Sequence, residues 1–233
     1  MKEQKYYSLE LDEAEKEADL IIFGDITSYA GTESDVSAYN LSMKLATLEA
    51  DTINVHINSY GGEVAEGLAI YNRLKQHKAK IKTYCDGFAC SIASVIFMAG
   101  DERVMSNAST LMIHNPWTWI SGNAAELRKT AEDLDKLAQA SVNAYLGSVT
   151  LSEEEIKKLM DEETWILPDE ALEYGFATAV TGAKAQEKYS QSVRRIILQK
   201  LTGRLPLASI LAPKIDEPKK NNLLKMFANI KEI

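Results

Sequence analysis

The sequence contains few of the residues that mark secreted, metal-binding or membrane proteins. Its 233 residues include two cysteines, three histidines and five prolines. Cys85 and Cys90 fall on an expected strand and its following turn, where a disulfide would be strained, so two reduced thiols are expected. No apolar run approaches the length of a bilayer span, and the stretch 1–7 is charged rather than signal-like. We therefore expect a cytoplasmic protein with no membrane association.

A surplus of basic charge is also missing. The formal net charge of −8 disfavours nucleic acid as the main partner. No metal-binding or nucleotide-binding motif occurs, so neither a metal nor another cofactor is expected. What the sequence does have is a hydrophobic content of 45%, which suffices for one sizeable core.

A first strand, turn and helix are predicted around residues 53–75. Residues 53–57 alternate β-branched and polar side chains, Asn58 and Ser59 end the strand, and Gly61 and Gly62 form a tight turn. The helix that follows is indicated by apolar residues three and four apart, namely Val64, Leu68, Tyr71 and Leu74. The free N–H groups at its start lie near Gly62.

The pattern then repeats, with a strand at 81–85, a turn at Asp86–Gly87 and an apolar helix at 91–99. Ser91 thus stands at a helix start, where it is either a simple N-cap or a nucleophile. The N–H of Ile92 would point toward an oxyanion formed by attack of Ser91, with the N–H of Gly62 as second donor.

The general base is sought among three histidines. A third strand at 110–113 delivers His114 at its end, where Asn115–Pro116 stops the ladder. His77 lies at a helix end beside lysines, and His56 lies inside a strand. His114 is therefore the best-placed base, and the combination with Ser91 indicates a serine hydrolase.

Four blocks carry a family resemblance: INSYGG, GFACSIAS, LMIHNP and EETWILPDEALEYG. They resemble the proteolytic subunit of Clp-type proteases (ClpP) in order and over residues 19–181. The resemblance implies an α/β fold of the crotonase-like superfold, with repeated ββα units, a parallel sheet and a protruding handle helix. It also implies a serine endopeptidase in which Ser91 is the nucleophile, His114 the base, and the N–H groups of Gly62 and Ile92 the oxyanion hole.

The third member of the triad departs from the family pattern. Where the family has an aspartate, this sequence has Glu163, with Asp161 and Glu162 as fallback candidates. A glutamate can hold the imidazole tautomer as an aspartate does, with a longer reach. The usual proline of the glycine turn is Tyr60, which should cost stiffness and no chemistry.

A long amphipathic helix at 123–145 matches the family's handle, placed at about 121–160. Its apolar stripe consists of Leu127, Ala131, Leu134, Ala138 and Tyr145. The resemblance implies a homo-oligomer of heptameric rings stacked in pairs, which would cover the stripe. Trp117 and Trp119 line either the substrate groove or this interface. Ser152 and Glu155 predict a capping box for the next helix.

The C-terminal part is expected to be a separate region. Residues 183–233 hold 11 Lys and Arg against 4 Asp and Glu, while residues 1–182 are acidic. We expect a protease domain at 1–182 and a basic extension at 183–233 that is partly helical or disordered, docks on its own ring, or binds an acidic scaffold protein.

The extension, the ETW and MIHNPW motifs and an added N-terminal strand resemble the head maturation proteases of tailed phages and prophages, which process scaffold and capsid proteins. In that case the protein would be located in the cytoplasm of the host cell. The alternative is a housekeeping ATP-dependent Clp subunit that works with an ATPase chaperone. Two other classes stay open: a crotonase-like acyl-CoA enzyme and an inactive ring-forming assembly protein.

Overall fold

The computed structural model describes residues 7–12, 16–29 and 36–181. The predicted basic extension at 183–233 lies outside the described residues. The strands are β1 (Tyr7–Asp12), β2 (Glu17–Ile22), β3 (Thr52–Ser59), β4 (Lys80–Cys90), β5 (Glu102–Ser106), β6 (Thr110–Ile113), β7 (Thr164–Ile166) and β8 (Ala179–Thr181). The helices are α1 (Ala38–Thr47), α2 (Val64–Lys75), α3 (Ile92–Phe97), α4 (Ala124–Leu146), α5 (Glu153–Asp161) and α6 (Pro168–Tyr174).

The strands form one mostly parallel sheet in the order β1-β2-β3-β4-β5-β8, with β6 paired to β4 and β7. Among the strands that the structure describes, only β1 on β2 and β7 on β6 are antiparallel pairs. Strands that alternate with helices produce this arrangement, because a parallel connection needs a crossover. The α/β fold class predicted from the sequence is confirmed, and β1 precedes the parallel strands as an antiparallel edge strand.

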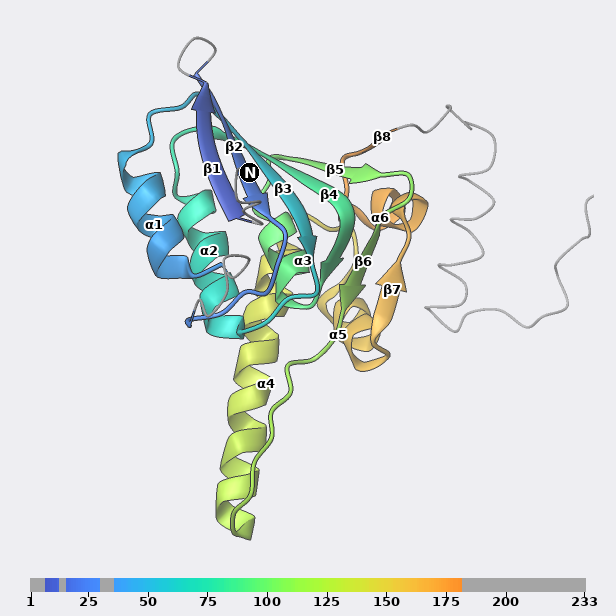
Figure 1. Ribbon diagram of the computed structural model, residues 1–233. Coiled ribbons are helices and arrows are strands. Elements are labelled where there is room, and N and C mark those ends of the chain that lie inside the picture. The colour runs from blue at the N-terminus through green and yellow to red at the C-terminus, as the bar shows by residue number, and fades with distance from the viewer. Residues whose placement is uncertain (1–6, 13–15, 30–35, 182–233) are drawn as a thin grey trace, which may run out of the picture. The chain divides into compact units, whose positions relative to one another are not determined.

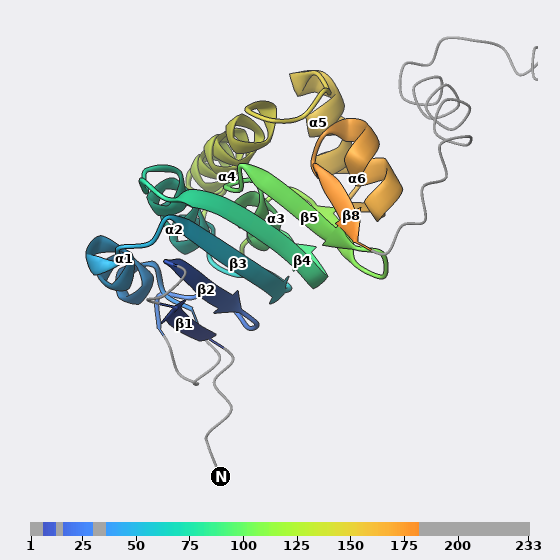
Figure 2. The same ribbon diagram turned by 90° about the horizontal axis from the view of Figure 1, so that it is seen from above.

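Helices α1, α2 and α3 lie against one face of the sheet (Figures 1 and 2). The sequence dictates which face, because β3 buries Ile53, Val55 and Ile57 completely while the residues between them stay half-exposed. The helix α2 turns Gly67, Ile70 and Leu74 to the core. Of the predicted stripe only Leu74 is fully buried, because the helix meets α3 through Gly67, where a Cβ would come within 2.1 Å of Ile92.

Strand β4 is longer than predicted and divides its pairing between two neighbours. Its first half pairs with β5 and its last three residues pair with β6. The predicted turn at Asp86–Gly87 is wrong, since the strand continues through both residues. Gly87 is needed for close approach: its Cβ would lie 2.6 Å from the side-chain oxygen of Asn58, which accepts a hydrogen bond from the N–H of Phe88.

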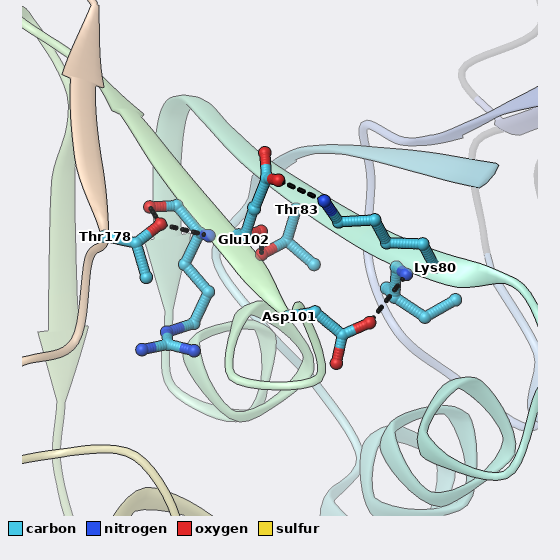
Figure 3. Close-up of polar contacts among 7 residues, drawn as sticks. Lys80, Thr83, Asp101, Glu102 and Thr178 are labelled. Carbon is cyan, nitrogen blue, oxygen red and sulfur yellow. Dashed lines mark hydrogen bonds and ion pairs between the residues drawn. The ribbon is translucent and has the colours of Figure 1, made fainter.

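Polar contacts fasten β5 to its surroundings (Figure 3). Lys80 pairs with Glu102 across the β4–β5 edge, and the Thr178 hydroxyl lies 2.8 Å from the N–H of Arg103. The guanidinium of Arg103 is buried and donates to three carbonyl oxygens, those of Gly100, Gly175 and Phe176. These bonds tie the segment before β8 to the sheet, so β8 extends it beyond β5.

Helix α4 extends away from the sheet, and only its C-terminal end packs on the core (Figure 1). Its buried residues are Ser141, Val142, Ala144 and Tyr145. Asn123 forms a capping box with Glu126, so the helix starts within one residue of the prediction. The predicted capping box of Ser152 and Glu155 is likewise present at the start of α5. No helix in the described ranges is long and apolar enough to cross a membrane.

Candidate active site

Ser91 stands between the end of β4 and the start of α3, in a backbone conformation that side chains rarely adopt. Its φ is 54° and its ψ is −129°. Such a conformation persists only where the surroundings impose it, and here the N–H of Ser91 donates to the carbonyl of Met112 at 2.8 Å. The side chain makes no capping bond to the helix, so the simple N-cap interpretation is wrong. The hydroxyl of Ser91 is half-buried and is not occupied by a bond to the helix backbone.

The hydroxyl of Ser91 lies 2.8 Å from Nε2 of His114. The pairing of β4 with β6 produces this contact, because the register that aligns Cys90 with Met112 brings both strand ends to one edge. His114 follows β6 directly, where the sequence predicted it. With the ring proton on Nδ1, Nε2 accepts the hydrogen bond of Ser91 and has the geometry of a general base.

The glycine turn lies against Ser91. Gly61 and Gly62 have φ of 103° and 147°, in the range that favours glycine. A Cβ on Gly61 would lie 2.7 Å from Cβ of Ser91, and a Cβ on Gly62 would lie 2.0 Å from the carbonyl oxygen of Ile26. No side chain fits at either position. The glycines thus allow two backbone segments to meet beside Ser91.

The direction of the Gly62 N–H follows from a short parallel bridge to Ile26. The N–H of Ile26 donates to Gly61 at 3.0 Å, and the N–H of Glu63 donates to Ile26 at 2.8 Å. In a parallel bridge the residue between those two partners turns its own N–H to the opposite side. The N–H of Gly62 therefore points away from Ile26, and its role as an oxyanion donor stays a prediction.

Buried and exposed hydroxyls hold the turn in place. The N–H of Gly61 donates to the Ser59 hydroxyl at 3.1 Å, and that hydroxyl donates to the carbonyl of Gly24 at 2.6 Å. Beyond the turn, Ser28 and Thr27 donate to the Glu63 carboxylate at 3.1 and 2.9 Å, and these bonds lower its pKa. From the sequence, Ser59 was expected only to end the strand. In the structure Ser59 is the last residue of β3 and its hydroxyl supports the turn.

Glu163 lies near the end of the β6–β7 ladder but does not bond to His114 in this structure. The last pair of the ladder is Ile113 with Thr164, and His114 and Glu163 are the residues that adjoin this pair. Glu163 is exposed and has a φ of 48°. Within the described ranges no hydrogen bond joins a carboxylate to His114. The backbone position fits a third triad member, and its role stays a prediction.

The two fallback carboxylates differ in their surroundings. Asp161 accepts a hydrogen bond of 2.7 Å from the side-chain amide of Asn115, the residue after His114. This bond ties the end of α5 to the end of β6. Glu162 is exposed at the C-cap of α5. Asp161 therefore has a structural partner, whereas Glu163 directly precedes the strand that pairs with β6.

The other two histidines are placed away from Ser91 by their own partners. His56 lies inside β3, bonds through Nδ1 to Asp86 at 2.8 Å and stacks on Tyr84. Its pKa is raised, chiefly by the hydrogen bond to Asp86. Nδ1 of His77 accepts from the N–H of Ala79 at 3.0 Å just past α2. Neither contacts the nucleophile.

Cys90 adjoins Ser91 and offers no competing nucleophile. Both cysteines are free and buried. Burial raises the pKa of Cys90 to about 11 and that of Cys85 to about 12, so the thiols stay protonated. The expectation of reduced thiols agrees with the structure. In the residues that the structure describes, no group of three or more His, Cys, Asp or Glu side chains is placed to hold a metal ion.

Aromatic side chains surround the strand ends. Tyr60 stacks on Phe88 at a centroid distance of 5.2 Å, and Phe88 meets the edge of Trp165 at 6.4 Å. Tyr60 therefore anchors the glycine turn to β4 in place of the stiffness that a proline would give. Trp117 and Trp119 are 69% and 90% exposed, and their predicted role in a groove or an interface stays a prediction.

A buried hydrogen-bonded pair behind Ser91 was not predicted. Ser94 on α3 and Tyr145 on α4 lie 2.8 Å apart through their side-chain oxygens. Ser94 was expected only to pack inside its helix, and Tyr145 to belong to the apolar stripe of the handle. Their separation of 51 residues in the chain hides the contact from sequence patterns. Only a buried tyrosine near the end of an exposed helix hinted at a partner.

Comparison with known proteins agrees with this geometry. A sequence model of the Clp protease family matches residues 16–184. An ATP-dependent Clp protease proteolytic subunit of Deinococcus radiodurans is 37% identical over 130 residues, which is 55% of this chain and 64% of the relative. Subunits of the same name from Borrelia garinii subsp. bavariensis and Borreliella afzelii are 27% identical over 157 residues and 28% identical over 152 residues. These matches cover 65% and 63% of this chain and 81% and 77% of the relatives.

Proposed function

The chain belongs to the Clp protease family, and from that premise we propose that it hydrolyses peptide bonds as a serine endopeptidase. The family assignment confirms the enzyme class expected from the sequence, a serine-type peptidase. The observation that carries the proposal for this chain is the 2.8 Å contact between the Ser91 hydroxyl and Nε2 of His114. A carbonyl placed against Ser91 would also meet the N–H groups of Gly62 and Ile92.

In the proposed mechanism the oxygen of Ser91 attacks a peptide carbonyl carbon while His114 accepts its proton. The carbonyl oxygen becomes an oxyanion, and the N–H groups of Gly62 and Ile92 donate hydrogen bonds to it. His114 then gives the proton to the leaving amine, and an acyl-enzyme remains on Ser91. A water molecule attacks the ester, again with His114 as base, and the acid product and free Ser91 are released.

Glu163 is proposed to orient the imidazole. A carboxylate that accepts a hydrogen bond from Nδ1 holds the tautomer in which Nε2 is the base, and it stabilises the imidazolium. The proposal is supported by the position of Glu163 and His114 next to the last pair of the β6–β7 ladder, Ile113 with Thr164. The extra methylene of a glutamate gives the side chain the reach to turn inward from its exposed position when substrate or a neighbouring subunit excludes water.

Within this activity, we propose a head maturation protease that assembles into paired rings and processes scaffold or capsid proteins. The motifs ETW and MIHNPW and the antiparallel strand β1 support it. A second candidate is a housekeeping subunit fed by an ATPase chaperone, which is favoured by the similarity to ATP-dependent Clp protease proteolytic subunits. Cleavage of a scaffold protein without any ATPase would support the first candidate, and cleavage of an unfolded protein only with an ATPase and ATP would support the second.

The activity itself is tested on the purified full chain. We expect a fluorophosphonate probe to label Ser91 and a fluorogenic peptide to be cleaved, and Ser91→Ala to abolish both. Ser109→Ala removes a buried hydroxyl that bonds to the carbonyl of Ser106 and should leave both signals intact. Equal peptide turnover by wild type and Ser91→Ala would refute the peptidase. Thioester turnover that survives Ser91→Ala would instead point to an acyl-CoA enzyme.

A further inference from the structure

Two buried hydroxyls form a chain of hydrogen bonds that ends on the carbonyl of Ser91. The Ser94 oxygen lies 2.5 Å from the Ser91 carbonyl oxygen and 2.8 Å from the Tyr145 hydroxyl. The side chains of Ser94 and Tyr145 are 0% and 2% exposed. Water therefore does not compete for these bonds, and each hydroxyl depends on the next for a partner.

The direction of the chain follows from counting protons. The carbonyl of Ser91 can only accept, so Ser94 must spend its single hydroxyl proton on it. The contact of 2.8 Å between Ser94 and Tyr145 then requires the tyrosine to donate. Burial raises the pKa of Tyr145, so its phenol keeps that proton. The order of donation is Tyr145 to Ser94 to the carbonyl of Ser91.

This carbonyl belongs to the same peptide group as the N–H of Ile92. The peptide bond is planar and trans, so the two groups lie in one plane and point in opposite directions. The backbone N–H of Ser94 also donates to the Ser91 carbonyl, at 3.0 Å. Two donors on one carbonyl fix the plane, and thereby fix the direction of the Ile92 N–H. A hydrogen-bonded carbonyl also polarises its peptide group and makes the N–H a stronger donor.

We propose that Tyr145 and Ser94 are positioning residues that aim and strengthen the Ile92 N–H as an oxyanion donor. Neither touches the substrate; both act through the 91–92 peptide group. The inference rests on the proposed peptidase function and adds to it the support of one oxyanion donor. Because Tyr145 is the second-last residue of α4, the support comes from the root of the handle.

Two conservative variants test the proposal. Tyr145→Phe keeps the ring and its edge contact with Phe176 but removes the donor to Ser94. Ser94→Ala removes the hydroxyl between Tyr145 and Ser91. Removal of a whole oxyanion donor costs roughly a hundredfold or more, so a weakened donor should lower kcat by about tenfold with KM unchanged. Affinity for a peptide boronic acid, which forms a tetrahedral adduct on Ser91, should fall by a similar factor.

The matched control is Tyr174→Phe. Tyr174 is 6% exposed, and its hydroxyl makes no hydrogen bond within the described ranges. Its loss should leave kcat and boronic acid affinity unchanged. Thermal melts of all variants separate a folding defect from a catalytic one. The double variant Ser94→Ala/Tyr145→Phe should be no slower than Ser94→Ala, since the tyrosine is proposed to act only through the serine.

The possible outcomes separate the positioning role of Tyr145 and Ser94 from the proposed peptidase activity. Normal kcat and normal boronic acid affinity in Tyr145→Phe and Ser94→Ala, with Ser91-dependent cleavage intact, would overturn the positioning role alone. Equal losses in kcat for Tyr174→Phe, or additive losses in the double variant, would overturn it as well. Absence of any Ser91-dependent cleavage by wild type would overturn the proposed function and this inference with it.

Discussion

The strand ends around Ser91 and the long helix α4 differ in backbone conformation. Among the described residues, Ser91 and Glu163 have φ of 54° and 48°, and the turn residue Gly62 has a φ of 147°. Helix α4 runs for 23 residues without a positive φ and closes its first turn with a capping box. The strand ends thus contain residues in unusual backbone conformations, whereas α4 is regular and largely exposed.

The difference indicates what each region needs from outside the chain. Strained backbone persists only where neighbours impose it, and Ser91 has such neighbours in Met112, Ser94 and the glycine turn. The contact of Ser91 with His114 therefore forms within one chain. The first half of α4 is mostly exposed, and Leu127 in its stripe is 44% exposed. We expect the stripe of the handle to be covered by another subunit.

The largest expected effect compares one glycine from each region. Gly62→Ala would place a Cβ 2.0 Å from the carbonyl oxygen of Ile26 at a φ of 147°. We expect a loss of stability of roughly 3 kcal/mol or more, together with a fall in peptidase activity of on the order of a hundredfold. Thermal melts and fluorophosphonate labelling measure both.

The control is Gly147→Ala at the end of α4. Gly147 has a φ of −63°, and a Cβ there would meet only a carbonyl oxygen 3.8 Å away. The substitution should be neutral or stabilising by up to about 1 kcal/mol, because alanine restricts the unfolded chain. Equal effects of the two substitutions would contradict the contrast between a strained and a regular region.

The next effect concerns Glu163, the carboxylate proposed to orient His114. Glu163→Gln should lower kcat by roughly a hundredfold or more with little change in KM, because an amide no longer stabilises the imidazolium. Steady-state kinetics on a fluorogenic peptide measure it. Glu162→Gln is the control and should be silent. A greater loss in Asp161→Asn than in Glu163→Gln would move the role to Asp161.

A smaller effect on folding, with a visible effect on assembly, is expected at the handle. Leu127→Lys changes an exposed position, so the free energy of unfolding of the single chain should change by about 0.5 kcal/mol or less. The oligomer should dissociate, because a charge would enter the proposed interface. Light scattering after size exclusion reports subunit number. Glu132→Lys, on the other side of α4, should leave the oligomer intact.

The smallest expected effect compares two ion pairs. Because the hydrogen bond to Asp86 raises the pKa of His56 above 6.5, the pair stabilises the fold below that pH, and the contribution is lost as pH rises through the raised pKa. Both side chains are about one-third exposed, so Asp86→Asn should cost at most about 1 kcal/mol near pH 5.5 and less near pH 8.

The matching pair on α4 is Lys129 with Asp133, and both of its side chains are exposed. The pKa of Asp133 is lowered by the lysine, so its charge does not change between about pH 5.5 and pH 8. Asp133→Asn should therefore show the same stability difference at both pH values in denaturant titrations. A pH-dependent difference in that variant, or none in Asp86→Asn, would contradict the assignment.

Much of the fold could be predicted because its signals are local. Strand β6 and helix α4 begin and end within one residue of their predicted bounds, since apolar spacing, capping residues and Asn115–Pro116 mark them in the chain. The predicted break at Asp86–Gly87 was wrong for the same reason. A local pattern shows a turn residue there, while the reason for the glycine is the side chain of Asn58 on a neighbouring strand.

The sequence by itself determined the residue types and their order: a serine and a histidine at strand ends, paired glycines, and a long capped helix. Only the tertiary structure decided that Ser91 and His114 meet, that Glu163 and His114 adjoin the same end of the β6–β7 ladder, and that Tyr145 reaches the backbone of Ser91 through Ser94. The physical reason is that spacing along the chain fixes local conformation, whereas hydrogen bonds between distant segments depend on strand register and on the packing of helices on the sheet.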